Sequence, residues 1–120
     1  MPKSSKPIVC INGSRSITDI NFDLFINPSH VGQIISGGAI GVDTLARQWA
    51  KKHKIDYIEY PANWKVWGKK AGIVRNKEMV EHCDILISFW DGKSKGTLQT
   101  IQYAIKLGVP YICHLIVQLD

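Results

Sequence analysis

The chain has 120 residues, of which 45% are hydrophobic and 21% are charged, and its formal net charge at pH 7 is +5. This composition is typical of a globular domain and excludes a disordered or fibrous chain. No apolar run reaches the roughly 20 residues that a membrane-spanning helix needs. The first residues, MPKSSKP, are polar and unlike a secretory signal. We therefore expect a single domain over residues 1–120, located in the cytoplasm and without a membrane segment.

The cysteines support this compartment. Cys10, Cys83 and Cys113 are odd in number, widely separated and without a CxxC spacing. This pattern is not typical of a disulfide framework or a zinc site. Because all three lie in apolar runs, we expect buried free thiols in a reducing cytoplasm and no bound metal.

Short apolar strands alternate with helical segments along the chain. Apolar runs bounded by turn residues predict five strands, at 7–12, 32–36, 57–60, 84–90 and 109–117. Helical spacing of apolar residues predicts four helices, at 17–26, 41–53, 70–83 and 97–107. In the last helix we expect Leu98, Ile101 and Ile105 to face inward and Gly108 to form the C-terminal cap.

Nearly all-apolar strands separated by helices indicate a parallel sheet that is covered on both faces. With right-handed crossovers, the predicted fold is α/β: a Rossmann-like, doubly wound three-layer domain with a mostly parallel five-stranded sheet. In such sheets ligands bind beyond the carboxyl ends of the strands, near the point where the strand order reverses. Four loops at 12–16, 36–43, 61–64 and 90–97 are therefore expected to share one rim.

The loop SGGAIGVD, residues 36–43, is the first candidate for a phosphate site. Gly37 and Gly38 would let a ligand approach the backbone, and a helix beginning near Gly41 offers unpaired N–H groups and a positive dipole end. The spacing is neither GxGxxG nor Walker A, and a tight strand-to-helix turn would explain the same glycines. Asp43 would accept hydrogen bonds from ribose hydroxyls, or only stabilise the start of the helix.

The loop WDGKSKGT, residues 90–97, precedes a second helix and is a second candidate for an anion site, with an ordinary turn and helix cap as the alternative. Asn76 shares a helical stripe with apolar residues, so its amide needs partners. Arg75 would pair with a phosphate or with a surface carboxylate. Trp64 and Trp90 would stack on a base or pack in the core.

The candidate ligand-binding residues come from all of these segments. They are Gly13, Ser14, Arg15, Ser36, Gly37, Gly38, Gly41, Asp43, Asn63, Trp64, Arg75, Asn76, Trp90, Asp91, Gly92, Lys95, Gly96 and Thr97. The sequence contains no convincing Ser-His-Asp, HExxH or paired-carboxylate arrangement, so no catalytic residue is assigned.

Five segments occur in an order that resembles a known family: GSRSITD, SGGAIGVDTLA, YPANW, GKKAGIVRNKEM and FWDGKSKGT. Together they resemble the small YspA/YpsA-related group of the SLOG superfamily. The resemblance implies a Rossmann-like fold and the binding of nucleotides or nucleotide-derived ligands, which some members sense and others hydrolyse.

Two related groups define the alternatives. The LOG-type phosphoribohydrolases have a PGGxGTxxE segment where this chain reads DGKSKGTLQT, with Thr100 in place of their catalytic glutamate. This departure argues against hydrolysis of an N-glycosidic bond, for which Asp43 or Asp91 would have to substitute. The DprA proteins share GSR, SGGAxG, YP, RN and a late glycine loop. That resemblance implies binding of single-stranded DNA, for which the basic cluster at 65–77 would supply charge.

The sequence therefore predicts a sensor or sequestering protein for a nucleotide-derived ligand. A nucleotide-processing enzyme and a single-stranded nucleic-acid binder are the alternatives. No cofactor is expected beyond the nucleotide-type ligand itself. A homo-oligomer is a further expectation, because related Rossmann-like domains often pair through exposed helices.

Overall fold

The computed structural model describes residues 6–117. Most of the polar segment MPKSSKP, for which we expect no secretory signal, therefore lies outside the described residues. Five strands form one sheet: β1 (Ile8–Gly13), β2 (Gln33–Ser36), β3 (Asp56–Glu59), β4 (Ile85–Trp90) and β5 (Tyr111–Leu115). Their order is β3-β2-β1-β4-β5, and every neighbouring pair is parallel. The predicted Rossmann-like α/β fold is confirmed, with a sheet that is entirely parallel.

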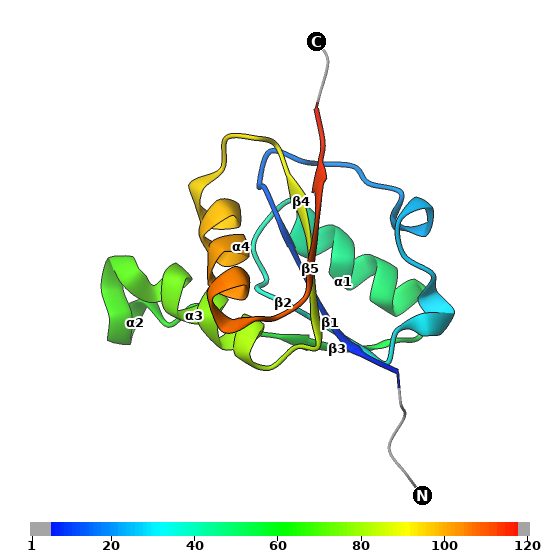
Figure 1. The fold of residues 1–120 in the computed structure, drawn as a ribbon, viewed down its shortest axis with the longest axis horizontal. Coiled ribbons are helices and arrows are strands. Elements are labelled where there is room, and N and C mark those ends of the chain that lie inside the picture. Colours follow the sequence, from blue (N-terminus) through cyan, green and yellow to red (C-terminus); the bar gives the residue numbers. More distant parts are fainter. Residues whose placement is uncertain (1–5, 118–120) are drawn as a thin grey trace, which may run out of the picture.

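Helices cover both faces of the sheet (Figure 1). Helix α1 (Val42–Lys52) lies on one face, together with the segment that carries the short 3-10 helices η1 (Phe22–Leu24) and η2 (Pro28–His30). Helices α3 (Ala71–Glu81) and α4 (Lys95–Leu107) lie on the other face. Within residues 6–117 no helix is long and apolar enough to cross a membrane.

Successive residues of each inner strand enter different halves of the core. Val9 and Ile11 of β1 pack with Trp49 on the α1 side, whereas Cys10 packs with Val80 and its neighbours on the α3–α4 side. This burial on both faces is why the inner strands read as continuous apolar runs and lack the alternation of a half-exposed sheet.

The strand order reverses between β1 and β4. From β1 the chain moves outward through β2 to β3, and it then returns to place β4 against the other side of β1. The carboxyl ends of these strands open into the four loops that the sequence singled out, so the loops do share one rim, at a topological switch point.

The predicted helix over 17–26 is wrong, because only the three residues of η1 are helical there. The Asn21 side chain accepts a hydrogen bond from the Asp23 N–H and holds a local turn. Such side chains compete with helix formation. Ile17, Phe22 and Ile26 still reach the core from this irregular segment.

The predicted inward face of α4 is also wrong in part. Ile101 is buried, but Leu98 and Ile105 are 36% and 55% exposed. The residues that pack inward with Ile101 are small: Thr97, Thr100 and Ala104. The helix begins at Lys95, two residues before the expected start, and Gly108 ends it in the left-handed conformation, as predicted.

The region between β3 and α3 contains two short elements that the sequence did not predict: α2 (Trp64–Trp67) and η3 (Gly68–Lys70). Asn63 caps α2 by accepting a hydrogen bond from the Val66 N–H at 3.2 Å. In Figure 1 α2 lies at the outer end of the α3–α4 layer. This position brings Trp64 toward the carboxyl rim of β2 and β3.

The last strand departs from the expectation of a covered sheet. β5 is an edge strand, and Tyr111, Ile112 and Leu115 are 44%, 45% and 59% exposed. The expectation of buried thiols is therefore wrong for Cys113, which is exposed on this strand, and incomplete for Cys83, which is half-buried. Cys10 alone of the three is fully buried.

Candidate functional site

The loops that follow β1 and β4 are bonded to each other. The backbone N–H of Ser14 donates to the carbonyl oxygen of Phe89 at 3.0 Å, and the Ser14 hydroxyl accepts from the Asp91 N–H at 3.0 Å. The same hydroxyl lies 3.5 Å from the hydroxyl of Thr97 on α4. Ser14, which is 1% exposed, is thus a structural junction between the two loops.

Asp91 organises the loop that leads into α4. One of its carboxylate oxygens accepts from the N–H groups of Lys93 and Ser94, both at 2.8 Å, and the other accepts from the Ser16 hydroxyl at 2.8 Å. These bonds, chiefly the backbone ones from Lys93 and Ser94, lower the pKa of Asp91 to about 2. Both oxygens are engaged in shaping the loop, so Asp91 is poorly suited to replace a missing catalytic acid.

Arg75 joins three segments around the rim. Its Nη1 donates to the carbonyl oxygen of Gly37 and, at 3.5 Å, to that of Tyr60. Its Nε donates to the amide oxygen of Asn76 at 2.8 Å. A Cβ on Gly37 would lie 2.5 Å from the guanidinium, so the absence of a side chain at residue 37 gives Arg75 room for this position. The alternative considered for Arg75, a pairing with a surface carboxylate, does not occur among the described residues.

Gly41 and Gly38 are needed for the backbone conformation of the turn between β2 and α1. Gly41 is the N-cap of α1 with φ 82°, and an added Cβ would lie 2.8 Å from the Cα of Arg15. Gly38 has φ 74° and lies under the carboxylate of Glu59. Only glycine adopts these conformations without strain. The tight-turn interpretation of this loop is therefore confirmed at Gly41, and it leaves room for a ligand as well.

Asp43 is the most unusual side chain of the rim. It is 6% exposed, and its Oδ2 accepts from the Ala39 N–H at 3.1 Å. Its Oδ1 is buried without a hydrogen-bond partner among the described residues. Burial raises the pKa of Asp43 to about 6, against the lowering effects of the Ala39 N–H, the charge of Arg75 and the nearby Gly37 N–H. A buried oxygen without a partner is costly unless a ligand or ordered water supplies a donor.

Two joined clefts open at the rim. The inner pocket has a volume of about 110 Å³ and contains Asp43, and the outer cleft has a volume of about 540 Å³ and contains Trp64. Arg15, Ala39 and Arg75 line both. The guanidinium of Arg15 makes no hydrogen bond within residues 6–117, so its donors are free to meet a ligand.

The structure brings ten of the predicted site residues into these clefts. The inner pocket is lined by Gly13, Arg15, Asp43, Arg75, Asn76, Gly96 and Thr97. The outer cleft is lined by Arg15, Gly37, Gly38, Trp64 and Arg75. These residues come from five separate segments of the chain, which only the sheet topology unites.

The other predicted residues lie outside the lining and support the loops. They are Ser14, Ser36, Gly41, Asn63, Trp90, Asp91, Gly92 and Lys95. Ser36, which is fully buried, is hydrogen-bonded to the Tyr57 hydroxyl. The indole N–H of Trp90 donates to the carbonyl oxygen of Ser94 at 2.9 Å.

Sequence reasoning missed two polar lining residues. Asn12, at the end of β1, is 6% exposed, accepts from the Ser88 hydroxyl and lines the inner pocket. Glu59 ends β3 and lines the outer cleft. Both are polar residues at the carboxyl end of a predicted strand, and this signal was available in the sequence.

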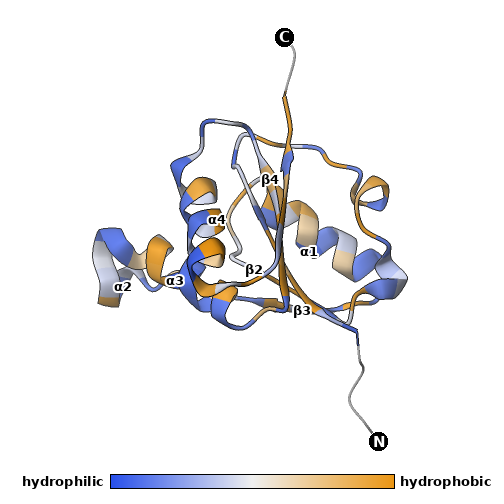
Figure 2. Ribbon diagram, in the orientation of Figure 1, coloured by the Kyte–Doolittle hydropathy of each residue, from blue (hydrophilic) through white to orange (hydrophobic). Residues whose placement is uncertain are grey.

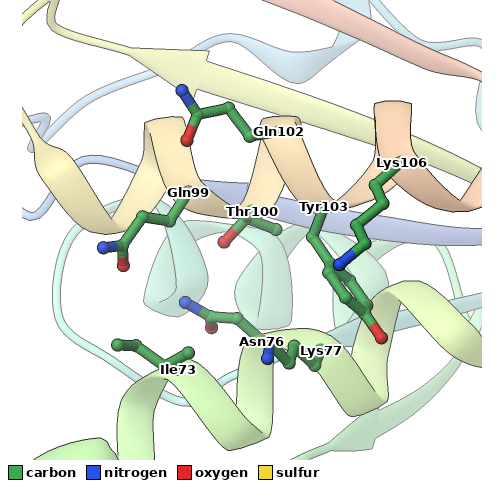
Figure 3. Close-up of a pocket in the computed structure, with 8 residues that line it drawn as sticks. All are labelled: Ile73, Asn76, Lys77, Gln99, Thr100, Gln102, Tyr103 and Lys106. Atoms are coloured by element: carbon green, nitrogen blue, oxygen red, sulfur yellow. The ribbon is translucent and has the colours of Figure 1, made fainter.

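A third groove lies beside the rim, between α3 and α4 (Figure 3). Its volume is about 300 Å³, and Asn76 lines both this groove and the inner pocket. Lys77 from α3 and Lys106 from α4 contribute ammonium groups to its walls. Thr100, at the position of the LOG-type glutamate, is 1% exposed, and its hydroxyl donates to the Gly96 carbonyl oxygen at 2.9 Å.

The parallel sheet, its switch point and the cleft beyond its carboxyl ends define the class of this chain as a Rossmann-like α/β domain. A family model described as "YspA, cpYpsA-related SLOG family" matches residues 28–67. The chain is also 36% identical over 85 residues to the gene 61 protein of Mycobacterium phage D29, an alignment that covers 66% of this chain and 68% of that protein. The chain belongs to the YspA, cpYpsA-related SLOG family.

A solved structure supports the fold independently. The X-ray structure of DNA processing protein A (DprA) from Streptococcus pneumoniae matches with a TM-score of 0.72 at 18% sequence identity. The match covers 96% of this chain and 52% of that chain, so this chain spans about half the length of the DprA structure. At this identity the likeness shows a shared fold.

Proposed function

We propose that the chain binds a nucleotide or nucleotide-derived ligand in the two joined clefts at the rim, as a sensor or sequestering protein. The observation that carries the proposal is the buried Oδ1 of Asp43, which has no hydrogen-bond partner within residues 6–117 and lies in a pocket that Arg15 and Arg75 also line. The membership of the SLOG family, which is generally nucleotide-related, supports the same class of ligand.

The two clefts suit different parts of such a ligand. The outer cleft combines the exposed indole of Trp64 with the apolar surfaces of Ile40, Pro61 and Ala62, which suits the face of a base. In the inner pocket, Asp43 accepts hydrogen bonds from sugar hydroxyls, which donate to the oxygen that lacks a partner.

The phosphate groups fit the side of the inner pocket that α4 provides. Gly96 lies in the first turn of this helix, and an added Cβ there would meet no atom within 4 Å, so the backbone is accessible. The helix N-terminus favours an anion. The free guanidinium of Arg15 adds charge from the opposite loop and offsets the repulsion that an ionised Asp43 would exert.

The proposal is tested by native mass spectrometry of the protein purified from cells and by calorimetric titration with AMP and ADP-ribose. We expect one bound nucleotide-type molecule per chain and at least about a tenfold loss of affinity in Arg15→Gln. Arg15 is the better variant than Arg75, because Arg75 also holds loops together. Lys54→Gln, which lies by another pocket, is the matched control. Absence of a co-purified ligand together with no heat of binding for either probe would overturn the proposal.

A second candidate function is the binding of single-stranded nucleic acid. The groove between α3 and α4 favours it, because Lys77 and Lys106 line a path that joins the inner pocket at Asn76. This function predicts an affinity for oligonucleotides that falls steeply with salt. In titrations at two salt concentrations, Lys106→Gln would then weaken oligonucleotide binding and leave AMP binding unchanged. Equal affinity of the wild-type chain for AMP and for strands would reject it.

A further inference from the structure

The two edges of the sheet differ in how they are protected. The edge strand β3 carries the charged residues Asp56 and Glu59, which discourage the addition of another strand. At the other edge, the segment 109–117 contains no Asp, Glu, Lys or Arg. Figure 1 shows that the described helices lie to either side of β5 and that none of them covers its free edge, and Figure 2 shows that the strand is predominantly hydrophobic.

The hydrogen bonds to β4 establish which backbone groups of β5 are free. The carbonyl oxygen of Pro110 accepts from Leu86, and the N–H of Ile116 donates to Trp90. In a parallel pair, alternate residues direct both backbone groups to the same neighbour. The residues that alternate with these therefore direct their N–H and C=O groups to the free edge. They are Tyr111, Cys113 and Leu115.

Both faces of this edge are apolar. On one face, the His114 ring lies 4.5 Å from the ring of the partly exposed Phe25, and Ile112, two residues before His114 on the same face of the strand, is 45% exposed. On the other face, Tyr111 and Leu115 are 44% and 59% exposed. A partner that lies on only one face would leave the other apolar face in water. A strand that belongs to a second sheet brings its own layers against both.

We propose that β5 pairs antiparallel with β5 of a second copy of this chain, so that the two sheets become continuous across a two-fold axis. A two-fold axis through the middle of β5 sets Cys113 opposite its counterpart and Tyr111 opposite Leu115. The uncharged strand is suited to self-pairing, because a charged residue near the axis would face a like charge from the second copy.

The oligomeric state of the full chain tests this interface. Sedimentation velocity over a range of concentrations should show a dimer, and Leu115→Lys should raise the dimer dissociation constant at least about a hundredfold. Ile58→Lys is the matched control, since Ile58 is a 45% exposed apolar residue on the opposite edge strand. Circular dichroism confirms that both variants are folded. A wild-type monomer at every concentration, or a dimer lost in Ile58→Lys and retained in Leu115→Lys, would overturn the proposal.

A short bismaleimide cross-linker gives a readout that does not depend on a destabilising variant. The reagent should join two copies of the wild-type chain through Cys113, and Cys113→Ser should abolish the cross-link while the chain still sediments as a dimer. A dimer that cross-links through Cys83 and not through Cys113 would place the interface elsewhere. Because each copy carries a net charge of +5, added salt should strengthen the dimer, whereas it weakens binding to nucleic acid.

Discussion

The Nη1 atom of Arg75 on α3 donates a hydrogen bond to the carbonyl oxygen of Gly37, which lies 38 residues earlier in the β2–α1 loop. The side chain crosses the space between two layers of the fold, and it fits there because residue 37 has no Cβ. Arg75 and Gly37 thus form one structural unit that shapes the wall shared by the inner pocket and the outer cleft.

We expect Arg75→Gln to lower the free energy of unfolding by about 1–3 kcal/mol, because the partly buried carbonyl oxygen of Gly37 loses a charged donor. Urea denaturation at pH 7 measures this. Lys69→Gln, on the exposed surface of η3, should change stability by less than about 0.5 kcal/mol. Equal stability of the two variants would show that Arg75 does not hold the loop.

Two glycine substitutions separate the turn from the ligand site. Gly41→Ala should destabilise the fold by about 2 kcal/mol or more, because φ is 82° there and the new methyl group meets the backbone of Arg15 and Ser14. Gly96→Ala meets no atom within 4 Å and should leave stability unchanged or raise it by up to about 1 kcal/mol.

The Gly96→Ala variant also tests whether α4 contributes to ligand binding. If α4 presents its first turn to phosphate, the methyl group of Gly96→Ala should weaken AMP binding in calorimetry although the fold is intact. Unchanged affinity in Gly96→Ala would remove α4 from the proposed phosphate site.

Asp43 predicts a pH-dependent stability. Its pKa is raised from 3.8 to about 6 in the folded chain, so the folded state favours the protonated carboxyl. The contribution of protonated Asp43 to the free energy of unfolding is fully present below pH 3.8 and is lost as pH rises through about 6. We expect Asp43→Asn to raise the free energy of unfolding at pH 7 by about 2–3 kcal/mol, and to flatten the profile between pH 4 and 6 in urea titrations. A variant whose profile parallels that of the wild type would contradict the assignment to Asp43.

Asp91 predicts the opposite dependence at lower pH. Its pKa is lowered from 3.8 to about 2 in the folded chain, so its stabilisation is present above pH 3.8 and is lost as pH falls through about 2. Acid unfolding followed by tryptophan fluorescence should therefore begin at higher pH in Asp91→Asn than in the wild type. Asp19→Asn, in the irregular segment after β1, provides a control on an exposed carboxylate.

The proposed sugar contact predicts a choice between ligands. The wild type should bind AMP at least about tenfold more tightly than 2′,3′-dideoxy-AMP, because only AMP offers donors to the Oδ1 of Asp43. Asp43→Asn should reduce this preference while stabilising the fold at pH 7, so that lost binding cannot be attributed to unfolding. Equal preference in both chains would exclude Asp43 as the sugar contact.

Much of the rim was predictable from local patterns. The loop after each buried strand was identified because glycines, hydroxyls and charges follow apolar runs, and the strand ends were predicted to within a few residues. Two predictions that depended on apolar spacing alone are wrong, each for its own physical reason. Asn21 forms a local turn where the apolar spacing indicated a helix, and α4 turns small residues such as Ala104 inward where Leu98 and Ile105 were expected.

The sequence by itself determined the parallel α/β class, the rim of loops and the family resemblance, since each depends on residues that are close along the chain. The tertiary structure alone decided which of those residues meet. The strand order placed β5 at an edge, and the approach of α3 bonded Arg75 to Gly37. The packing of α1 against the sheet buried Asp43 with no partner for Oδ1 in the described part of the chain. These relationships join distant segments, and their energies depend on burial and on neighbours that no local pattern specifies.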